Sequence, residues 1–136
     1  MTTEVARALT SLVPQLSSSA PPLEEQEIAD IALSPATALL VARDPRGRIV
    51  GSLTLVVFRT PTGSRAWIED VVVDEAQRGN GVGSALVNEA LARAEAAGAR
   101  TVDLTSRPSR EAANRMYLRI GFNRRDTHVY RYELRP

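Results

Sequence analysis

The sequence predicts an α+β domain in which helices flank a central, mixed but mostly antiparallel sheet. Three observations lead to this prediction. The chain has 136 residues, of which 43% are hydrophobic, which is enough for the core of one domain. Its first half carries strand-like segments joined by short turns, as antiparallel strands are. Its second half alternates helical and strand-like segments, so the complete order is helix–helix–β–β–β–α–β–α–β.

Two helices are expected before the first strand, because apolar residues recur at helical spacing and a serine- and proline-rich stretch at 17–22 then interrupts them. The turn Asp44-Pro-Arg-Gly47 joins two strands, since proline suits its second position and glycine its fourth. Three consecutive valines at 71–73 indicate a strand buried on both faces. The elements expected in this half are helices at 4–16 and 24–33 and strands at 37–43, 49–58 and 66–73.

The second half contains the clearest helix of the sequence, which Gly98 ends. A later helix can be capped by Ser109 and ended by Gly121. The alternation Val-Tyr-Arg-Tyr-Glu-Leu near the end of the chain predicts a last strand. The elements expected in this half are helices at 82–97 and 109–120 and strands at 101–105 and 129–134.

Composition argues against several classes of function. With 17 basic and 16 acidic residues the net charge is +1, so we expect neither a nucleic-acid nor a membrane partner. The chain has no cysteine and a single histidine, His128, so we expect no metal site. No apolar run approaches the ~20 residues of a membrane span, and Met-Thr-Thr-Glu does not resemble a signal peptide. A cytoplasmic location is therefore expected.

The segment from Asp74 to Ser84 predicts a binding site for a phosphate or pyrophosphate. It follows the buried valines, contains three glycines within five residues and opens the clearest helix. The first amides of a helix have no partner inside the helix, and the helix dipole places partial positive charge there. Glycines allow positive φ angles and let a ligand approach the backbone closely.

Two other kinds of phosphate loop match this segment less well. An ATP-type loop needs a lysine after its last glycine, but Gly83 is followed by Ser84 and Ala85. A dinucleotide fingerprint needs a third glycine where the chain has Ser84, and it belongs between parallel strands. A glycine-rich turn without any ligand is the remaining alternative.

Two motifs resemble those of the GNAT superfamily of N-acetyltransferases. The run Arg78-Gly-Asn-Gly-Val-Gly83 resembles its Arg/Gln-x-x-Gly-x-Gly/Ala signature. The run Asn114-Arg-Met-Tyr-Leu-Arg-Ile-Gly-Phe122 resembles its Asn-x-x-x-Tyr-x-x-x-Gly-Phe segment. The two motifs occur in the family's order with a strand between them, and the resemblance covers about residues 37–134.

The resemblance implies a GNAT fold, whose twisted sheet is splayed between the strands at 66–73 and 101–106. It implies one acetyltransferase domain over 1–136, with a helical acceptor-side segment at 1–35 and an acetyl-CoA-binding core at 71–122. Family members usually begin with a strand before the first helix. Here a helix is expected almost from Met1, so that strand is expected to be absent or displaced.

The resemblance also implies how acetyl-CoA, the cosubstrate, is held. Amides of residues 79–84 would bind its pyrophosphate, and backbone groups of Val71 and Val73 would hold the pantetheine arm like an added strand. Asn114 matches a further CoA-contacting position. The candidate cofactor-binding residues are Val71, Val72, Val73, Arg78, Gly79, Asn80, Gly81, Val82, Gly83, Ser84 and Asn114.

Acetyl transfer needs a neutral amine, a stabilised oxyanion and a proton for the departing thiolate. Tyr117 matches the family position of the acid that supplies this proton, although it also lies on an apolar helix stripe and could serve packing alone. Glu69 and Asp70 are candidate bases, because adjacent strand residues face opposite ways and one of the two should face the cleft. The resemblance favours Glu69, and ordinary hydrogen-bonded strand carboxylates are the alternative.

The predicted function is N-acetyl transfer from acetyl-CoA to a primary amine of a small molecule or peptide, by direct attack through a ternary complex. The alternative is a non-catalytic acyl-CoA-binding regulatory module. The run Ile68-Glu-Asp-Val-Val-Val73 also resembles a strand of glucosamine-phosphate N-acetyltransferases, but it is too short to name a sugar substrate. Trp67 would serve packing or form a pocket wall. Because the last predicted strand could reach a sheet edge, a homodimer is expected.

Overall fold

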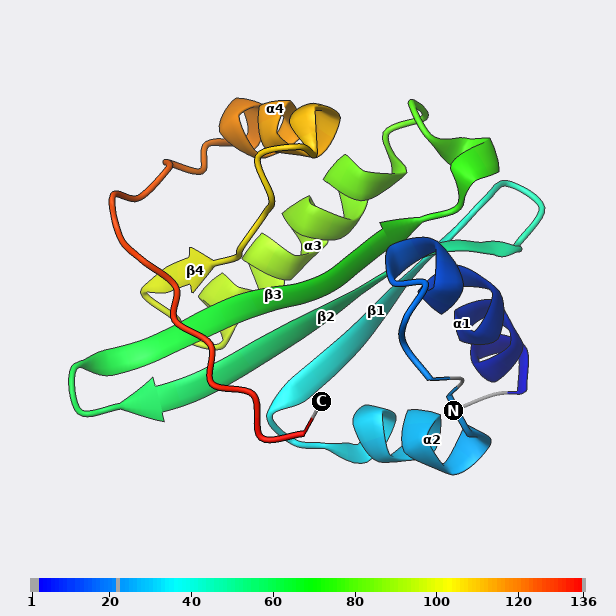
Figure 1. Cartoon of the computed structure of the whole chain (residues 1–136), viewed down its shortest axis with the longest axis horizontal. Helices are drawn as coiled ribbons and strands as arrows, with labels where there is room; N and C mark the ends of the chain where they lie inside the picture. The colour runs from blue at the N-terminus through cyan, green and yellow to red at the C-terminus, as the bar shows by residue number, and fades with distance from the viewer. Residues whose placement is uncertain (1–2, 22, 136) are drawn as a thin grey trace. The chain divides into compact units, whose positions relative to one another are not determined.

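The computed structural model describes residues 3–21 and 23–135 (Figure 1). The chain divides into two compact units, Met1–Thr105 and Ser106–Pro136. The first unit begins with two helices and continues into a sheet, a short 3-10 turn and a third helix. Its elements are α1 (Thr3–Leu16), α2 (Glu25–Leu33), β1 (Thr37–Arg43), β2 (Ile49–Thr60), β3 (Gly63–Val73), η1 (Glu75–Gln77), α3 (Val82–Ala96) and β4 (Thr101–Asp103).

The sheet has the strand order β1-β2-β3-β4. The pairs β1–β2 and β2–β3 are antiparallel, and β3–β4 is parallel. The parallel pair extends over only three positions, from Arg65 opposite Thr101 to Trp67 opposite Asp103. Among the described residues, β3 has no partner strand on this side beyond Trp67, which confirms the predicted splay.

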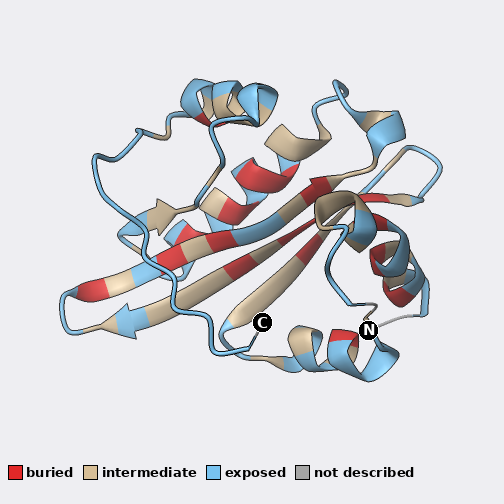
Figure 2. Ribbon diagram, in the orientation of Figure 1, coloured by how far each residue is buried: buried red, intermediate tan, exposed pale blue. Residues whose placement is uncertain are grey.

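One face of the sheet packs against α3. Leu53, Leu55 and Ile68 on this face are almost completely buried (Figure 2). Gly51 allows the close approach of the helix, because a Cβ there would lie 2.9 Å from Val82 Cγ1 and 3.1 Å from Leu86 Cδ1. The start of α3 is therefore held tightly against β2.

The opposite face packs against α1 and α2. Ala6 and Leu9 of α1 and Ile28 of α2 form a buried cluster, against which Leu39 of β1 packs. Leu39 is paired with Thr54 of β2, so the side chains of both residues belong to this face. The capping box expected of a stable helix start is present at α2, where Glu24 and Glu27 bond to each other's backbone.

A β-bulge interrupts β3 opposite Leu53. Thr54 pairs with Glu69 and Ser52 with Val72, so two residues, Asp70 and Val71, lie opposite Leu53 alone. Asp70 has a φ of 52° and is the only non-glycine residue in the described part of the chain with a positive φ. Strict alternation of side chains therefore fails at this bulge, and both Glu69 and Asp70 are exposed.

The second unit contains α4 (Glu111–Ile120) and a long irregular tail. Arg110, and not Ser109 as predicted, occupies the N-cap position, and it makes no side-chain cap hydrogen bond. The strand predicted at 129–134 is not formed, because this segment has no strand partner in the described residues. The strand predicted at 101–105 is shorter than expected and ends at Asp103.

Candidate functional site

The glycine-rich segment of the first unit leaves β3 through a tightly bonded turn. The side chain of Asp74 accepts a hydrogen bond of 3.1 Å from the Ala76 amide and so caps η1. The Asn80 side chain then donates to Gln77 Oε1 at 3.1 Å. Gly79 and Gly81 have φ angles of 86° and 79°, and Gly81 is the N-cap residue of α3. These positive φ angles explain why glycine stands at both positions.

The backbone of this segment is open to a ligand. In the described part of the chain, the amides of Gly79, Gly81, Val82, Gly83 and Ser84 have no hydrogen-bond acceptor. A Cβ placed on Gly79 or Gly81 would meet no atom within 4 Å, so the space above these residues is free. Free amides, the positive end of the α3 dipole and the exposed Arg78 together suit a phosphate or pyrophosphate.

The unpaired half of β3 leads directly to this turn. Because β4 ends opposite Trp67, backbone groups along the outer edge of residues 68–73 are free to bond an extended ligand. Val71 and Val73 are half-buried, and Val72 is buried on the face of α1 and α2, where it pairs with Ser52. The structure thus places the three valines between the open edge and the glycine turn.

Glu69 lies on the sheet face that carries α1 and α2, because it pairs with Thr54. Asp70 follows it at the bulge, in a left-handed conformation that costs a non-glycine residue roughly 1–2 kcal/mol. Such strain is often found at functional sites. Neither carboxylate has an ion-pair or hydrogen-bond partner in the described residues, so both are available to a substrate.

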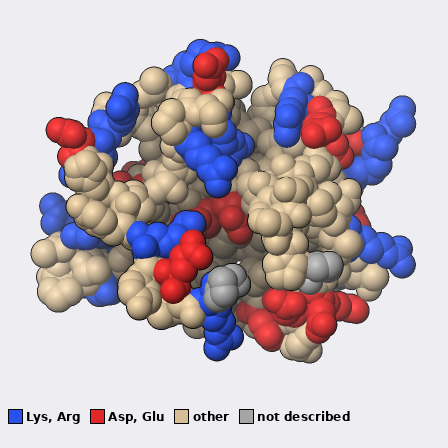
Figure 3. Space-filling model, in the orientation of Figure 1, with Lys and Arg blue, Asp and Glu red and all other residues tan. Residues whose placement is uncertain are grey.

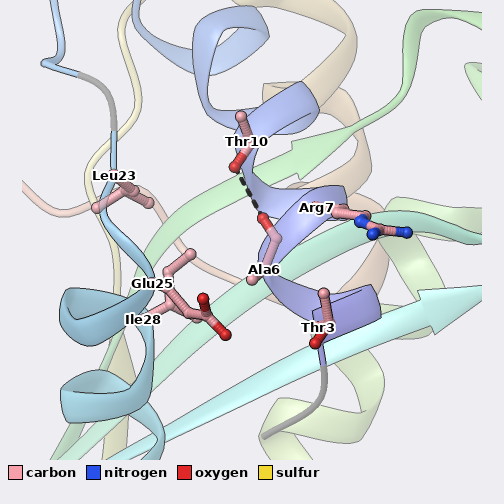
Figure 4. Close-up of a pocket in the computed structure, with 7 residues that line it drawn as sticks. All are labelled: Thr3, Ala6, Arg7, Thr10, Leu23, Glu25 and Ile28. Carbon is pink, nitrogen blue, oxygen red and sulfur yellow. Dashed lines mark hydrogen bonds between the residues drawn. The ribbon is translucent and has the colours of Figure 1, made fainter.

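A pocket of about 310 Å³ lies between α1 and α2 (Figure 4). Its floor is apolar, with Ala6, Leu23 and Ile28, while Arg7 and Glu25 supply charge at its wall. Acidic side chains also gather over α2 (Figure 3), where Glu24, Glu25, Glu27 and Asp30 are exposed. A cationic amine is attracted to such a surface.

In the second unit, Tyr117 is the buried residue of α4, with 7% of its surface exposed. Its ring contacts Phe122 edge to face, with ring centres 5.7 Å apart. Gly121 ends the helix with a φ of 123°, and the Phe122 amide donates to the Tyr117 carbonyl at 3.0 Å. In the motif at Asn114–Phe122, the tyrosine and the Gly-Phe pair therefore pack together as one local unit.

Burial raises the pKa of the Tyr117 hydroxyl above its usual value near 10, while the positive charge of Arg110 acts in the other direction. The hydroxyl is therefore protonated at neutral pH, as a proton donor must be. Asn114, one turn earlier, uses its side-chain amide to bond the Arg107 carbonyl at 3.0 Å. This bond holds the loop that precedes α4.

Comparison with known proteins identifies the family. The model of the acetyltransferase (GNAT) family matches residues 5–122. The chain belongs to this family. It is 39% identical over 110 residues to glucosamine 6-phosphate N-acetyltransferase of Trypanosoma brucei brucei, covering 76% of this chain and 73% of that protein.

One solved structure agrees with this family, and a second shares the fold. A crystal structure of a Trypanosoma brucei acetyltransferase has a TM-score of 0.79 and 31% identity, covering 98% of this chain and 96% of that one. A structure described as a transcriptional regulator from Bacillus halodurans has a TM-score of 0.84 and 26% identity, covering 98% and 96% of the two chains. As a GNAT protein, the chain is an acetyl-CoA-dependent acetyltransferase.

Acetyl-CoA is the family's cosubstrate, and the first unit suits it. The free amides of Gly79 and of residues 81–84 would hold the pyrophosphate, and the open edge of β3 would hold the pantetheine arm. Among residues 3–21 and 23–135 there is no group of three or more metal-ligating side chains. The same residues include no helix long and apolar enough to cross a membrane.

Sequence reasoning did not single out Asp103 or Ser106. Asp103 pairs with Trp67 and so belongs to the same sheet face as Glu69, which only the strand register reveals. Ser106 Oγ is buried without a hydrogen-bond partner in the described part of the second unit. An unsatisfied buried hydroxyl is costly, so it marks a position for a polar atom from a ligand or a water molecule.

The glycine turn can be tested with Gly81→Asp. The new carboxylate would stand at the positive end of α3 and repel the pyrophosphate, so we expect the affinity for acetyl-CoA to fall more than about 100-fold. Isothermal titration calorimetry measures this loss, and the rise in melting temperature that acetyl-CoA gives the wild type should disappear.

Gly47→Asp is the matched control. Gly47 has a φ of 84° and free space around its missing Cβ, so the substitution brings similar backbone strain and the same charge to the β1–β2 turn. It should leave the affinity for acetyl-CoA unchanged. Equal affinity in folded Gly81→Asp and wild type would rule out the glycine turn as the pyrophosphate site.

Proposed function

We propose that this protein transfers the acetyl group of acetyl-CoA to a primary amine of a small molecule or peptide, by direct attack within a ternary complex. The observation that carries the proposal is the open edge of β3, which runs from Glu69 at the acceptor face to the free amides of the glycine turn. The exposed acids of α2 and the α1–α2 pocket support an acceptor side formed by residues 1–35.

Glu69 is proposed to prepare the acceptor. An exposed carboxylate without an internal partner can accept a proton from the acceptor ammonium, directly or through water. Once neutral, the amine has the lone pair needed to attack the acetyl carbonyl that acetyl-CoA supplies. Asp70 is the alternative base, because it is equally exposed.

Tyr117 is proposed to be the proton donor for the departing thiolate. Its hydroxyl is protonated at physiological pH, since even an unperturbed tyrosine has a pKa near 10, and burial raises this pKa further. Ring packing against Phe122 restricts its orientation, which favours proton transfer along a defined direction.

A regulatory module that binds acyl-CoA without catalysis is the second candidate. The similarity to a structure described as a transcriptional regulator favours it. An assay of acetyl transfer over a broad amine panel separates the two, because only an enzyme releases free CoA in step with acetylated amine. Binding of acetyl-CoA without any transfer would support the regulatory module.

Tyr117→Phe keeps the aromatic ring and removes the proton donor. We expect turnover to fall by ~10²–10⁴, the usual contribution of one general acid, while the affinity for acetyl-CoA stays unchanged. Stopped assays of acetylated amine and calorimetry measure the two quantities. Tyr130→Phe is the control, because Tyr130 is 89% exposed and should lose nothing. Full activity in Tyr117→Phe would mean that this tyrosine serves packing alone.

Glu69→Gln tests the base through the pH dependence of turnover. We expect a large loss near pH 7 that shrinks toward high pH, because an alkylamine with a pKa near ~10 then deprotonates without help. Asp70→Asn, the neighbouring exposed carboxylate, should lose less. If Glu69→Gln loses the same fraction of turnover at every pH, Glu69 positions the substrate and is not the base. If the pH-dependent loss of turnover occurs in Asp70→Asn instead, Asp70 is the base.

The chain is also proposed to form a homodimer through its C-terminal tail. Val129, Tyr130, Tyr132 and Leu134 are between 71% and 89% exposed (Figure 2). In an extended segment every second side chain lies on the same face, so one face would carry Tyr130, Tyr132 and Leu134. Such a row of apolar side chains is stabilised when the segment pairs with a sheet edge of a second copy.

Light scattering at tens of micromolar protein should therefore give the mass of two chains. The double substitution Tyr132→Asp and Leu134→Asp places charge on the apolar row and should give a monomer with unchanged affinity for acetyl-CoA. A monomeric mass for the wild type would refute the dimer.

A further inference from the structure

A second pocket of about 310 Å³ lies at the turn between β2 and β3, where β4 begins. It is lined by Thr62, Gly63, Ser64, Arg65, Arg100 and Thr101. Neither arginine forms an ion pair with an acid in the described part of the chain. The pocket therefore holds two positive charges that no internal carboxylate neutralises.

Both arginines are held in place by their surroundings. Arg65 Nη2 donates to Thr62 Oγ1 at 2.7 Å, and the Arg100 amide donates to the Ser64 carbonyl at 2.9 Å. The Arg100 side chain crosses the turn at Gly63, where a Cβ would come within 3.1 Å of Arg100 Cδ. Glycine at this position, with a φ of 140°, leaves room for the arginine stem.

The strand register connects this pocket with the proposed acceptor face. Arg65 pairs with Thr101 and Trp67 with Asp103, and residues two apart on a strand share a face. Arg65, Trp67 and Glu69 therefore follow one another along one face of β3. Arg65 and Glu69 are four residues apart, which corresponds to roughly 13 Å between their Cα atoms.

This row has charge of opposite sign at its two ends. The guanidinium groups of Arg65 and Arg100 lie at one end of the row. The carboxylate of Asp103 lies beside Trp67, and that of Glu69 lies at the other end. The half-buried indole of Trp67 lies between the two ends. A small molecule with an anionic group and an ammonium group would be oriented by this arrangement, with its amine at Glu69. Guanidinium groups and hydroxyls are preferred ligands of phosphate oxygens.

We propose that Arg65 and Arg100 form a subsite for the phosphate group of a phosphorylated amine acceptor. This inference rests on the proposed function for the identity of the ligand, since it assumes that the amine is the acetyl acceptor. The phosphates of acetyl-CoA are not the ligand here. The glycine turn, which would bind those phosphates, comes after Val73 at the end of β3. Val73 is eight residues from Arg65, which corresponds to roughly 26 Å along the strand.

Inorganic phosphate tests the subsite without any acetyl transfer. In a titration followed by amide NMR, we expect phosphate to shift the signals of Gly63, Ser64 and Thr101, separately from those of the glycine turn. Arg65→Gln and Arg100→Gln should each weaken binding at these amides by about 10- to 100-fold, as expected for one charge-assisted hydrogen-bonding group.

Arg59→Gln is the matched control. Arg59 is an exposed arginine of the same hairpin, but it pairs with Ser64 and belongs to the opposite face. Its loss should leave phosphate binding at Gly63, Ser64 and Thr101 unchanged. No shift of these three amides in the wild type, or equal binding in Arg65→Gln, would overturn the subsite.

Paired acceptors test its role in acetyl transfer. With glucosamine 6-phosphate against glucosamine, and phosphoethanolamine against ethanolamine, the wild type should show a KM about 10- to 100-fold lower for the phosphorylated member. Arg65→Gln should remove this advantage with little change in kcat. Equal KM values within each pair in the wild type would overturn the acceptor role. Failure to acetylate any amine would instead contradict the proposed function, and the phosphate titration would still decide the subsite.

Discussion

β3 is paired with β2 along almost its whole length and with β4 along only three residues. The open edge proposed for the pantetheine arm depends on this unequal pairing. The long ladder fixes β3 in the sheet, so its free outer edge remains ordered without a partner strand. The bulge opposite Leu53 shifts the face of the chain between Ile68 and Val72 and leaves Glu69 and Asp70 exposed. A fully paired β4 would cover the edge that an extended ligand needs.

The close packing of α3 on the sheet converts this edge into a binding site. Because Gly51 has no side chain, Val82 and Leu86 approach β2 directly, and the helix start stands just beyond the end of β3. Gly79 and Gly81 turn the chain with positive φ angles, and five amides of this turn have no acceptor among the described residues. Glycine thus serves two different physical purposes, close packing at Gly51 and backbone access at the turn.

The second unit is ordered by contacts between residues that are close in the sequence. Tyr117, Gly121 and Phe122 form a local unit in which the helix end and the ring contact support each other, and burial raises the pKa of the tyrosine hydroxyl. The tail beyond it exposes large apolar side chains, which costs free energy in water. A segment of this composition gains stability when a partner covers it, which is the physical basis for the proposed homodimer.

The sequence by itself determined the order of the elements and the glycine turn, because helical periodicity, turn residues and glycines act over a few neighbouring residues. The two motifs at Arg78–Gly83 and Asn114–Phe122 were local in the same way. Only the tertiary structure decided the bulge at Asp70, the exposure of both Glu69 and Asp70, and the unpaired state of 129–134. It alone placed Arg65 beside Arg100, 35 residues later, and Asp103 beside Trp67. These features depend on strand register and pairing, which are set by contacts between distant parts of the chain.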